Sequence, residues 1–322
     1  MDSISFNVSK EIEVENLNEE YDIVILGGGP AGLTSAIYSA RAKMKTLVIE
    51  KEIIGGEAAS TDLIENYPGF PEGISGMELA ERMEEQAVRF GAHIVYANID
   101  SLDLKSQPKI IKIDSKTIKA KSIIITSGTS PKALNIPGEK EFKGKGVSYC
   151  ATCDGPIFSG KDIAIIGCGN SGLQEGLFIL KFVKSLTMVE FLPTIQAEKI
   201  LQERMDTHEN VKWLLNHQIT AINGKDWVSS ITVKNRENNE EKDIPVQGVF
   251  IYVGLIPNTA YLGEQIKLNK WGYILTDEKM ATSLPGVFAA GDIRETQIRQ
   301  VATAIGDGAV AASSAQQYIE NM

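Results

Sequence analysis

Two stretches of the chain share one order of apolar and polar positions. Residues 21–27, YDIVILG, are a β-branched apolar run that predicts a buried parallel strand. A glycine-rich turn and an apolar helical stretch follow at 27–42, and KTLVIE at 45–50 predicts a second strand ending in an acidic residue. The order recurs at 161–167, 167–183 and 185–190. Strand, glycine turn, helix, strand and acid together are typical of a dinucleotide-binding unit, so we predict two such units.

The segments between and after these units predict the domain organisation. Apolar β-type runs occupy 93–104 and 109–128, and a Pro/Gly-rich linker follows at 129–139. Further β-type runs lie at 229–235 and 244–254, LIPN at 255–258 is a second crossover, and the chain ends in a strand and a long small-residue helix. We therefore predict an α/β fold with two Rossmann-like, three-layer ββα domains, the second inserted in the first. The predicted ranges are an N-terminal extension at 1–20, a first domain at 21–132 and 258–322, and a second at 133–257.

Composition and charge narrow the class of protein. A chain of 322 residues is long enough for two domains. The net charge of −10 argues against nucleic-acid binding, which favours a basic face. No apolar run reaches the roughly 18 residues that span a bilayer, and the first twenty residues lack the basic and apolar regions of a signal peptide. We expect a cytoplasmic protein without membrane or nucleic-acid partners.

The first glycine turn has the spacing that diphosphate binding requires. Gly27 permits the tight turn, Gly29 lets a pyrophosphate approach the backbone, and Gly32 allows close packing of helix on strand. The amino terminus of the helix then presents free N–H groups to the diphosphate. Glu50 is placed to accept hydrogen bonds from ribose hydroxyls. The alternative, a glycine turn without a ligand, is less favoured because strand, helix and acid are all present.

The second glycine turn keeps the spacing but leaves its ligand open. Gly167, Gly169 and Gly172 repeat the pattern, and the next strand ends in Glu190. A carboxylate there suits the ribose 2′-hydroxyl of NADH and repels the 2′-phosphate of NADPH. The alternative is a fold element that has lost its ligand.

The chain has three cysteines, of which two form a Cys-x-x-Cys pair. Cys150 and Cys153 can close a small disulfide loop and exchange it with a partner, and Asp154 can supply a proton to a thiolate leaving group. The alternative is two buried structural cysteines. Cys168 is read as a small packed residue. We predict no metal site, because no second Cys or His pair accompanies CATC.

Five motifs in this order resemble a low-molecular-weight bacterial-type thioredoxin reductase. They are GGGPAGLTSAIYSAR, ENYPGF, CATCDG, GVFAAGD and RQVATAIGDG, and the resemblance covers nearly the whole chain after residue 20. It implies FAD in the first domain. The residues that it places around FAD are Gly27, Gly29, Pro30, Ala31, Gly32, Glu50, Gly55, Gly56, Glu57, Asn66, Ile99, Gly128, Gly291, Asp292, Arg299, Gln300 and Val301. Glu57 stands where the family usually has Gln.

The resemblance also implies a catalytic route and partners. Cys153 is expected to accept electrons from the flavin, Cys150 to attack the disulfide of thioredoxin, and Asp154 to act as the acid. The family further implies rotation between the two domains and a homodimer. Many of its members are reduced by NADPH.

One departure from the family concerns the electron donor. NADPH-dependent members carry a His-Arg-Arg-x-x-x-Arg run after the second strand, and the aligned residues here are Glu190 to Gln196, EFLPTIQ, with all three arginines absent. Each lost Arg–phosphate contact removes roughly 1.5–3 kcal/mol. This pattern resembles the ferredoxin-dependent flavin thioredoxin reductases. The leading hypothesis is therefore reduction by ferredoxin, the second is an NADH-dependent thioredoxin reductase, and a third is a non-catalytic flavin redox sensor.

Overall fold

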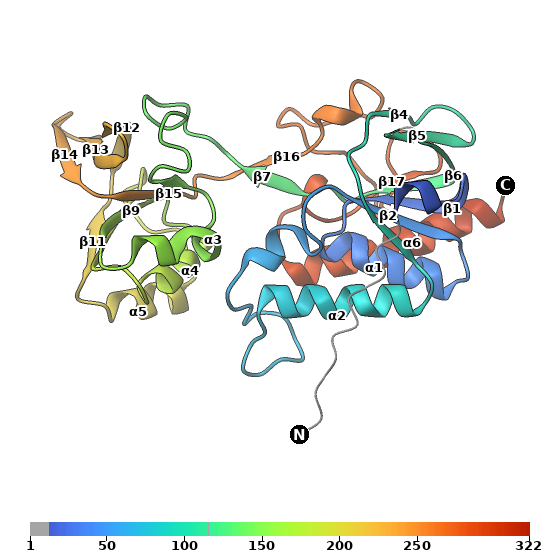
Figure 1. The fold of residues 1–322 in the computed structure, drawn as a ribbon, viewed down its shortest axis with the longest axis horizontal. Coiled ribbons are helices and arrows are strands. Elements are labelled where there is room, and N and C mark those ends of the chain that lie inside the picture. Colours follow the sequence, from blue (N-terminus) through green and yellow to red (C-terminus); the bar gives the residue numbers. More distant parts are fainter. Residues whose placement is uncertain (1–12, 115) are drawn as a thin grey trace. The chain divides into compact units, whose positions relative to one another are not determined.

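The computed structural model describes residues 13–114 and 116–322 and divides into two compact units (Figure 1). The first unit comprises the chain up to Ser130 together with Ile256–Met322, and the second is Pro131–Leu255. The second unit is thus inserted in the first. Of the predicted extension 1–20, residues 1–12 lie outside the described residues. Residues 14–16 form a short 3-10 turn, η1 (Val14–Asn16), and Leu17 is buried in the core of the first unit.

The first unit contains a mixed sheet in the strand order β3-β2-β1-β6-β5-β4, with β17 paired to the end of β6. The pairs formed among β1, β2, β3, β6 and β17 are parallel, whereas β4–β5 and β5–β6 are antiparallel. These strands are β1 (Glu20–Leu26), β2 (Thr46–Glu50), β3 (His93–Tyr96), β4 (Ser101–Asp103), β5 (Lys109–Ile113), β6 (Lys116–Ile125) and β17 (Val287–Ala289).

Both faces of this sheet are buried, which explains why its strands read as continuous apolar runs. Along β1, Ile23 and Ile25 pack among the helices, whereas Val24 and Leu26 pack into a second core on the opposite face. The helices are α1 (Pro30–Arg41), α2 (Gly76–Arg89) and α6 (Val301–Glu320). Short 3-10 turns are η2 (Gly56–Ser60), η4 (Ala260–Leu262) and η5 (Gly291–Ile293).

The second unit has three layers around a parallel sheet of order β11-β10-β9-β15-β8. One core packs this sheet against helices, and a second packs its other face against the antiparallel sheet β12-β13-β14. The strands are β8 (Val147–Ser148), β9 (Asp162–Ile166), β10 (Ser185–Val189), β11 (Val211–Leu214), β12 (His217–Gly224), β13 (Val228–Asn235), β14 (Glu241–Pro245) and β15 (Gly248–Ile251). The helices are α3 (Ala151–Asp154), α4 (Asn170–Ile179) and α5 (Lys199–Asp206), with the 3-10 turn η3 (Gly155–Phe158). The predicted class, two Rossmann-like α/β units, is confirmed.

The two crossovers between the units run as a pair of short strands. These are β7 (Thr129–Pro131) and β16 (Leu255–Pro257), which pair with each other. The units separate after residues 130 and 255, where the sequence placed boundaries after 132 and 257. Both predicted crossover segments, 129–139 and 255–258, therefore begin at the paired strands.

Candidate functional site

The first glycine turn is closed by contacts that only glycine permits. Gly27 has φ +117°, in the left-handed region that favours glycine. A Cβ on Gly32 would lie 1.9 Å from the carbonyl oxygen of Gly27, so any side chain there would separate α1 from β1. Gly29 caps α1 and Pro30 is its first residue, a position that suits the fixed φ of proline. The amino terminus of α1 is thus held directly at the end of β1.

Glu50 closes the other side of this turn. One oxygen of its carboxylate accepts a hydrogen bond from Gly28 N at 2.6 Å, and the other accepts from Lys51 N at 2.7 Å and Glu52 N at 2.8 Å. These backbone donors fix the carboxylate at the carboxyl end of β2, beside the turn. A carboxylate offers about four lone-pair positions, so acceptor capacity remains for ribose hydroxyls.

The space beside Gly29 fits a diphosphate. The nearest heavy atom to a Cβ built on Gly29 is Gly55 O at 4.0 Å, and nothing lies within 4 Å of a Cβ on Gly128. Gly55 and Gly56 have φ +92° and +54°, which lets the 3-10 turn η2 pass close to Gly29. Gly128 has φ +57°, which by itself favours glycine, whereas Gly29 has an ordinary extended backbone, so the space beside Gly29 is open to a ligand.

The carboxyl-terminal segment brings further predicted residues to α1. A Cβ on Gly291 would meet that of Ala31 at 2.9 Å. Asp307, which the sequence analysis did not single out, accepts from Gly291 N at 3.2 Å and from Arg294 Nε at 2.6 Å. The motif RQVATAIGDG contains this aspartate, followed by Gly308, and could have indicated it. A Cβ on Gly308 would lie 2.3 Å from Ala31 O, which explains why α6 needs glycine there.

The remaining predicted FAD residues lie in the same unit. Asn66 Nδ2 donates to Oε1 of Gln300 at 2.9 Å, and Gln300 caps α6, whose first residue is Val301. Ile99 packs at the edge of the core on the other face of the sheet. The buried Nε of Arg299 has no hydrogen-bond partner, although its guanidinium lies 4.4 Å from the ring centre of Tyr273. An orphaned buried donor in this set fits a polar cofactor, and the assignment of these residues to FAD remains a prediction.

Two acidic side chains in this set have raised pKa values. Burial raises the pKa of Asp292 to about 6, Arg299 opposes this effect, and Asp307 adds to it. Burial, together with Glu52 and Asp292, also raises the pKa of Glu57. The position at which the family usually has Gln thus holds a carboxyl group whose pKa lies above its ordinary value.

We expect Asp292→Asn to stabilise the FAD-free protein at pH 7 by about 1–3 kcal/mol, since one pKa unit is 1.36 kcal/mol. The folded pKa of Asp292 lies above the unfolded value of about 4, so its contribution to stability is fully present below pH 4. That contribution is lost as the pH rises through about 6. Urea unfolding of both apoproteins from pH 4 to 8 measures the difference, which should vanish near pH 4. A difference that does not change with pH would contradict the assignment.

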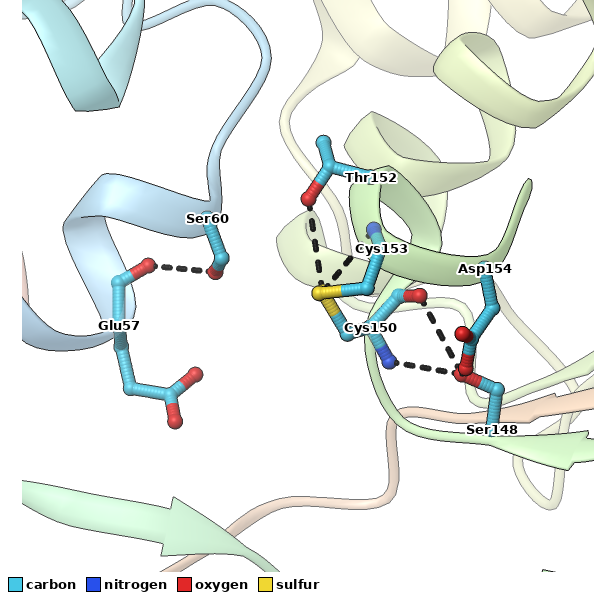
Figure 2. The surroundings of a disulfide bond; sticks show 7 residues. All are labelled: Glu57, Ser60, Ser148, Cys150, Thr152, Cys153 and Asp154. Atoms are coloured by element: carbon cyan, nitrogen blue, oxygen red, sulfur yellow. Dashed lines mark hydrogen bonds between the residues drawn. A yellow bond between two sulfur atoms is a disulfide. The ribbon is translucent and has the colours of Figure 1, made fainter. Parts of the chain in front are cut away.

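The Cys-x-x-Cys pair forms a disulfide at the start of α3 (Figure 2). Cys150 and Cys153 have Cα atoms 5.4 Å apart, and Cys153 N donates to Cys150 Sγ at 3.3 Å. Asp154 lies on the same turn, and its Oδ2 accepts from the hydroxyl of Ser148 at 2.6 Å. The two sulfurs and the candidate acid are thus held by one short helix that follows β8.

Cys168 is buried and is not part of this disulfide. Burial raises the pKa of its thiol, and the nearby Glu190 carboxylate raises it further. Because the thiolate is the reactive form, this thiol is inert. We expect iodoacetamide to label Cys150 and Cys153 after reduction and to leave Cys168 unlabelled in the folded protein. Mass spectrometry of the digested protein measures this, and labelling of Cys168 at a similar rate would contradict its assignment as a packed residue.

The second glycine turn repeats the geometry of the first. Gly167 has φ +103°, and a Cβ on Gly172 would lie 1.9 Å from Gly167 O. Glu190 accepts from Cys168 N at 2.6 Å and from Leu192 N at 2.9 Å, as Glu50 does in the first unit. Nothing lies within 4 Å of a Cβ on Gly169, so that position is also open to a ligand.

An arginine reaches the segment after Glu190 from a distant part of the chain. Phe191 and Leu192 are half exposed, where the family's NADPH-binding arginines would align. The guanidinium of Arg236, beyond the end of β13, lies 3.7 Å from the ring centre of Phe191 and donates to Phe191 O at 2.9 Å. It also donates to Asn216 Oδ1 at 3.2 Å. Sequence reasoning missed Arg236, because the residue is 45 positions from Phe191.

Two features are absent from the described part of the chain. No helix there is long and apolar enough to cross a bilayer. Among the same residues, no cluster of three or more His, Cys, Asp or Glu side chains is arranged to hold a metal ion.

Comparisons with known proteins match almost the whole chain. The family model of the pyridine nucleotide-disulphide oxidoreductases matches residues 21–308. A thioredoxin reductase of Bacillus subtilis is 43% identical over 94% of this chain and 96% of its own. A 34.2 kDa protein in the rubredoxin operon of Clostridium pasteurianum is 42% identical over 94% and 98%.

Solved structures show the same relation. Lactococcus lactis thioredoxin reductase superposes with a TM-score of 0.91 at 38% identity, over 94% of this chain and 100% of its own. A ferredoxin-flavin thioredoxin reductase from Clostridium acetobutylicum is more distant, with 27% identity and a TM-score of 0.51 over 94% and 99%. The chain therefore belongs to the pyridine nucleotide-disulphide oxidoreductases and, within them, to the low-molecular-weight thioredoxin reductases, which are FAD-containing flavoproteins.

Proposed function

We propose that the chain is a thioredoxin-disulfide reductase whose electron donor is not NADPH. The redox disulfide Cys150–Cys153 supports the first part, together with the full-length similarity to thioredoxin reductases. The single observation that carries the second part is Glu190, a buried carboxylate at the second glycine turn where the family has the first residue of its phosphate-binding run. The proposal extends to a homodimer in the cytoplasm.

The chain's own groups account for the disulfide chemistry. FAD, when bound, supplies the electron pair that breaks the Cys150–Cys153 bond. Cys153 is the sulfur that accepts this pair, Cys150 leaves as a thiolate, and Asp154 gives it a proton. Asp154 then takes the proton back as Cys150 attacks the thioredoxin disulfide, and Cys153 resolves the mixed disulfide. The enzyme disulfide is regenerated, and the two thioredoxin sulfurs leave as thiolates that take protons from the solvent.

Glu190 argues against NADPH by charge and by geometry. Its carboxylate is held by two backbone N–H groups, so it does not swing away when a nucleotide binds. A dianionic 2′-phosphate would be brought against this charge without the three arginines of the family. Arg236 offers a single cation where the family has three arginines, and one of its terminal nitrogens already donates to Phe191 O and Asn216 Oδ1.

NADH is the donor that this geometry favours. The bonds of Glu190 to Cys168 N and Leu192 N match those of Glu50 to Gly28 N and Glu52 N in the FAD unit. If Glu50 serves a ribose there, Glu190 is equally placed to serve the adenosine ribose of NADH. An open Gly169 and a formed turn support the same conclusion.

Reduced ferredoxin is the second candidate. The loss of every arginine in the aligned run and the likeness to the ferredoxin-flavin thioredoxin reductase of Clostridium acetobutylicum favour it. The missing arginines argue against NADPH, however, without selecting between ferredoxin and NADH. The order of preference given by the sequence alone is therefore reversed here.

An assay independent of the donor tests the disulfide reductase activity. The holoenzyme is reduced anaerobically with one equivalent of dithionite per electron pair and mixed with thioredoxin disulfide. We expect reoxidation of the flavin and one reduced thioredoxin per electron pair. A flavin that stays reduced in the presence of thioredoxin would rule out the proposed function.

A further inference from the structure

Ser148 joins the candidate acid to the backbone of the redox cysteine. It is the last residue of β8, an edge strand of the parallel sheet, and only 5% of it is exposed. Its Oγ lies 2.6 Å from Asp154 Oδ2, 3.1 Å from Cys150 N and 3.2 Å from Cys150 O (Figure 2). One buried hydroxyl therefore contacts both residues that the proposed proton transfer uses.

When Asp154 is ionised, the Ser148 hydroxyl cannot make all three hydrogen bonds at the same time. A serine hydroxyl has one proton to donate, and here it faces two acceptors, Asp154 Oδ2 and Cys150 O. When Asp154 is ionised, the hydroxyl donates to the carboxylate and accepts from Cys150 N. When Asp154 is protonated, the carboxyl donates to Ser148 Oγ, and the hydroxyl turns to Cys150 O. Each protonation state of Asp154 then has a complete set of hydrogen bonds at unchanged heavy-atom positions.

We propose that Ser148 is a positioning residue that holds Asp154 in one place in both of its protonation states. Asp154 loses its proton to the Cys150 thiolate when the disulfide opens and regains it when Cys150 attacks an acceptor disulfide. Rotation of the Ser148 hydroxyl accommodates each change without moving the carboxyl group. This inference rests on the proposed disulfide chemistry and adds a residue to it.

The second unit offers a matched control for this hydrogen bond. Ser185 Oγ also donates to an aspartate, Asp162 Oδ1, at 2.6 Å. Ser185 and Asp162 begin β10 and β9, at the amino ends of the parallel strands, whereas Cys150 follows the carboxyl end of β8. Ser185→Ala therefore removes a part-buried Ser–Asp bond of the same length without touching the disulfide.

The test follows flavin reoxidation in dithionite-reduced holoenzyme mixed with thioredoxin disulfide. We expect Ser148→Ala to lower the maximal rate about tenfold, a fraction of the 10²–10⁴ that general acid–base catalysis contributes, with half-saturation by thioredoxin unchanged. Ser185→Ala should stay within about twofold of wild type. In an Asp154→Asn background, Ser148→Ala should have no further effect, because Ser148 acts through Asp154.

Two shape-matched variants separate the hydroxyl from packing. Ser148→Thr keeps the hydroxyl and Ser148→Val has the same shape without it, so we expect Thr to react about tenfold faster than Val. This pair decides the matter even if Ser148→Ala does not fold. Equal rates for Thr and Val, or an undiminished effect of Ser148→Ala beside Asp154→Asn, would overturn the proposal.

A second acceptor separates this proposal from the proposed function. The same comparison is made with the small aromatic disulfide 5,5′-dithiobis(2-nitrobenzoate), and Cys153→Ser gives the direct background rate. Wild-type protein that reduces the small disulfide but not thioredoxin would refute the proposed function alone. The rates of Ser148→Thr and Ser148→Val with the small disulfide then test the role of Ser148. A tenfold faster Thr variant supports it, and equal rates overturn it.

Discussion

Cys153→Ser protein is expected to bind FAD and to reduce thioredoxin at least about a thousandfold more slowly than wild type, because loss of a covalent catalyst removes the route and not only part of the binding. Cys150 remains as a free thiol in this variant. It should attack thioredoxin disulfide and stay joined to it, since no resolving thiol is left. Steady-state thioredoxin reduction measures the first effect, and non-reducing electrophoresis of the covalent complex measures the second.

Cys150→Ser should lose turnover to the same extent without forming that complex, because the attacking sulfur is absent. Cys168→Ser serves as the control, and we expect it to turn over within about twofold of wild type, since its buried thiol has a raised pKa and no disulfide partner. A Cys150→Ser protein that keeps its turnover would favour the non-catalytic redox sensor over the reductase.

Gly29→Ala and Gly169→Ala form a matched pair that should weaken the binding of different nucleotides, FAD in the first unit and NADH in the second. Neither new methyl group meets a heavy atom closer than 4.0 Å, so both proteins should fold. In the first unit the methyl group occupies the space assigned to the diphosphate of FAD. An overpacking cost of about 1.4–2.8 kcal/mol should weaken FAD binding by about 10–100-fold, measured by fluorescence titration of the apoprotein.

Gly169→Ala should retain FAD and dithionite-driven thioredoxin reduction. Its reduction by NADH should require about 10–100-fold more nucleotide, because the same cost now falls on the second diphosphate. Stopped-flow bleaching of the flavin against NADH concentration measures this. An unchanged NADH dependence would show that the second glycine turn does not bind the donor.

Much of the fold was predictable because periodicity and glycine spacing act locally. The strand that ends at Glu50, the strand that ends one residue before Glu190, and the helices after both glycine turns lie where the apolar pattern placed them. A parallel strand buried on both faces reads as a short apolar run, and the turn into a helix requires glycine at set positions. The Cys150–Cys153 pairing likewise followed from a local motif.

Residues that act through long-range contacts could not be predicted in this way. Arg236 reaches Phe191 only because β12 and β13 fold back beside β10, and no local spacing encodes that approach. Asp307 bonds Gly291 and Arg294 from another element, and Ser148 looks like an ordinary strand residue until Asp154 lies beside it. The missing arginines after Glu190 were readable from the sequence, whereas the backbone bonds that fix the Glu190 carboxylate appear only in the structure.

The most direct measurement is anaerobic bleaching of the bound flavin by NADH, NADPH and reduced ferredoxin, each added separately, followed by addition of thioredoxin disulfide. We expect fast bleaching by NADH, little bleaching by NADPH at the same concentration, and recovery of the oxidised flavin once thioredoxin is present. Bleaching by NADPH as fast as by NADH would contradict the role given to Glu190. Bleaching by ferredoxin alone would show that the second glycine turn has lost its nucleotide and that ferredoxin is the donor.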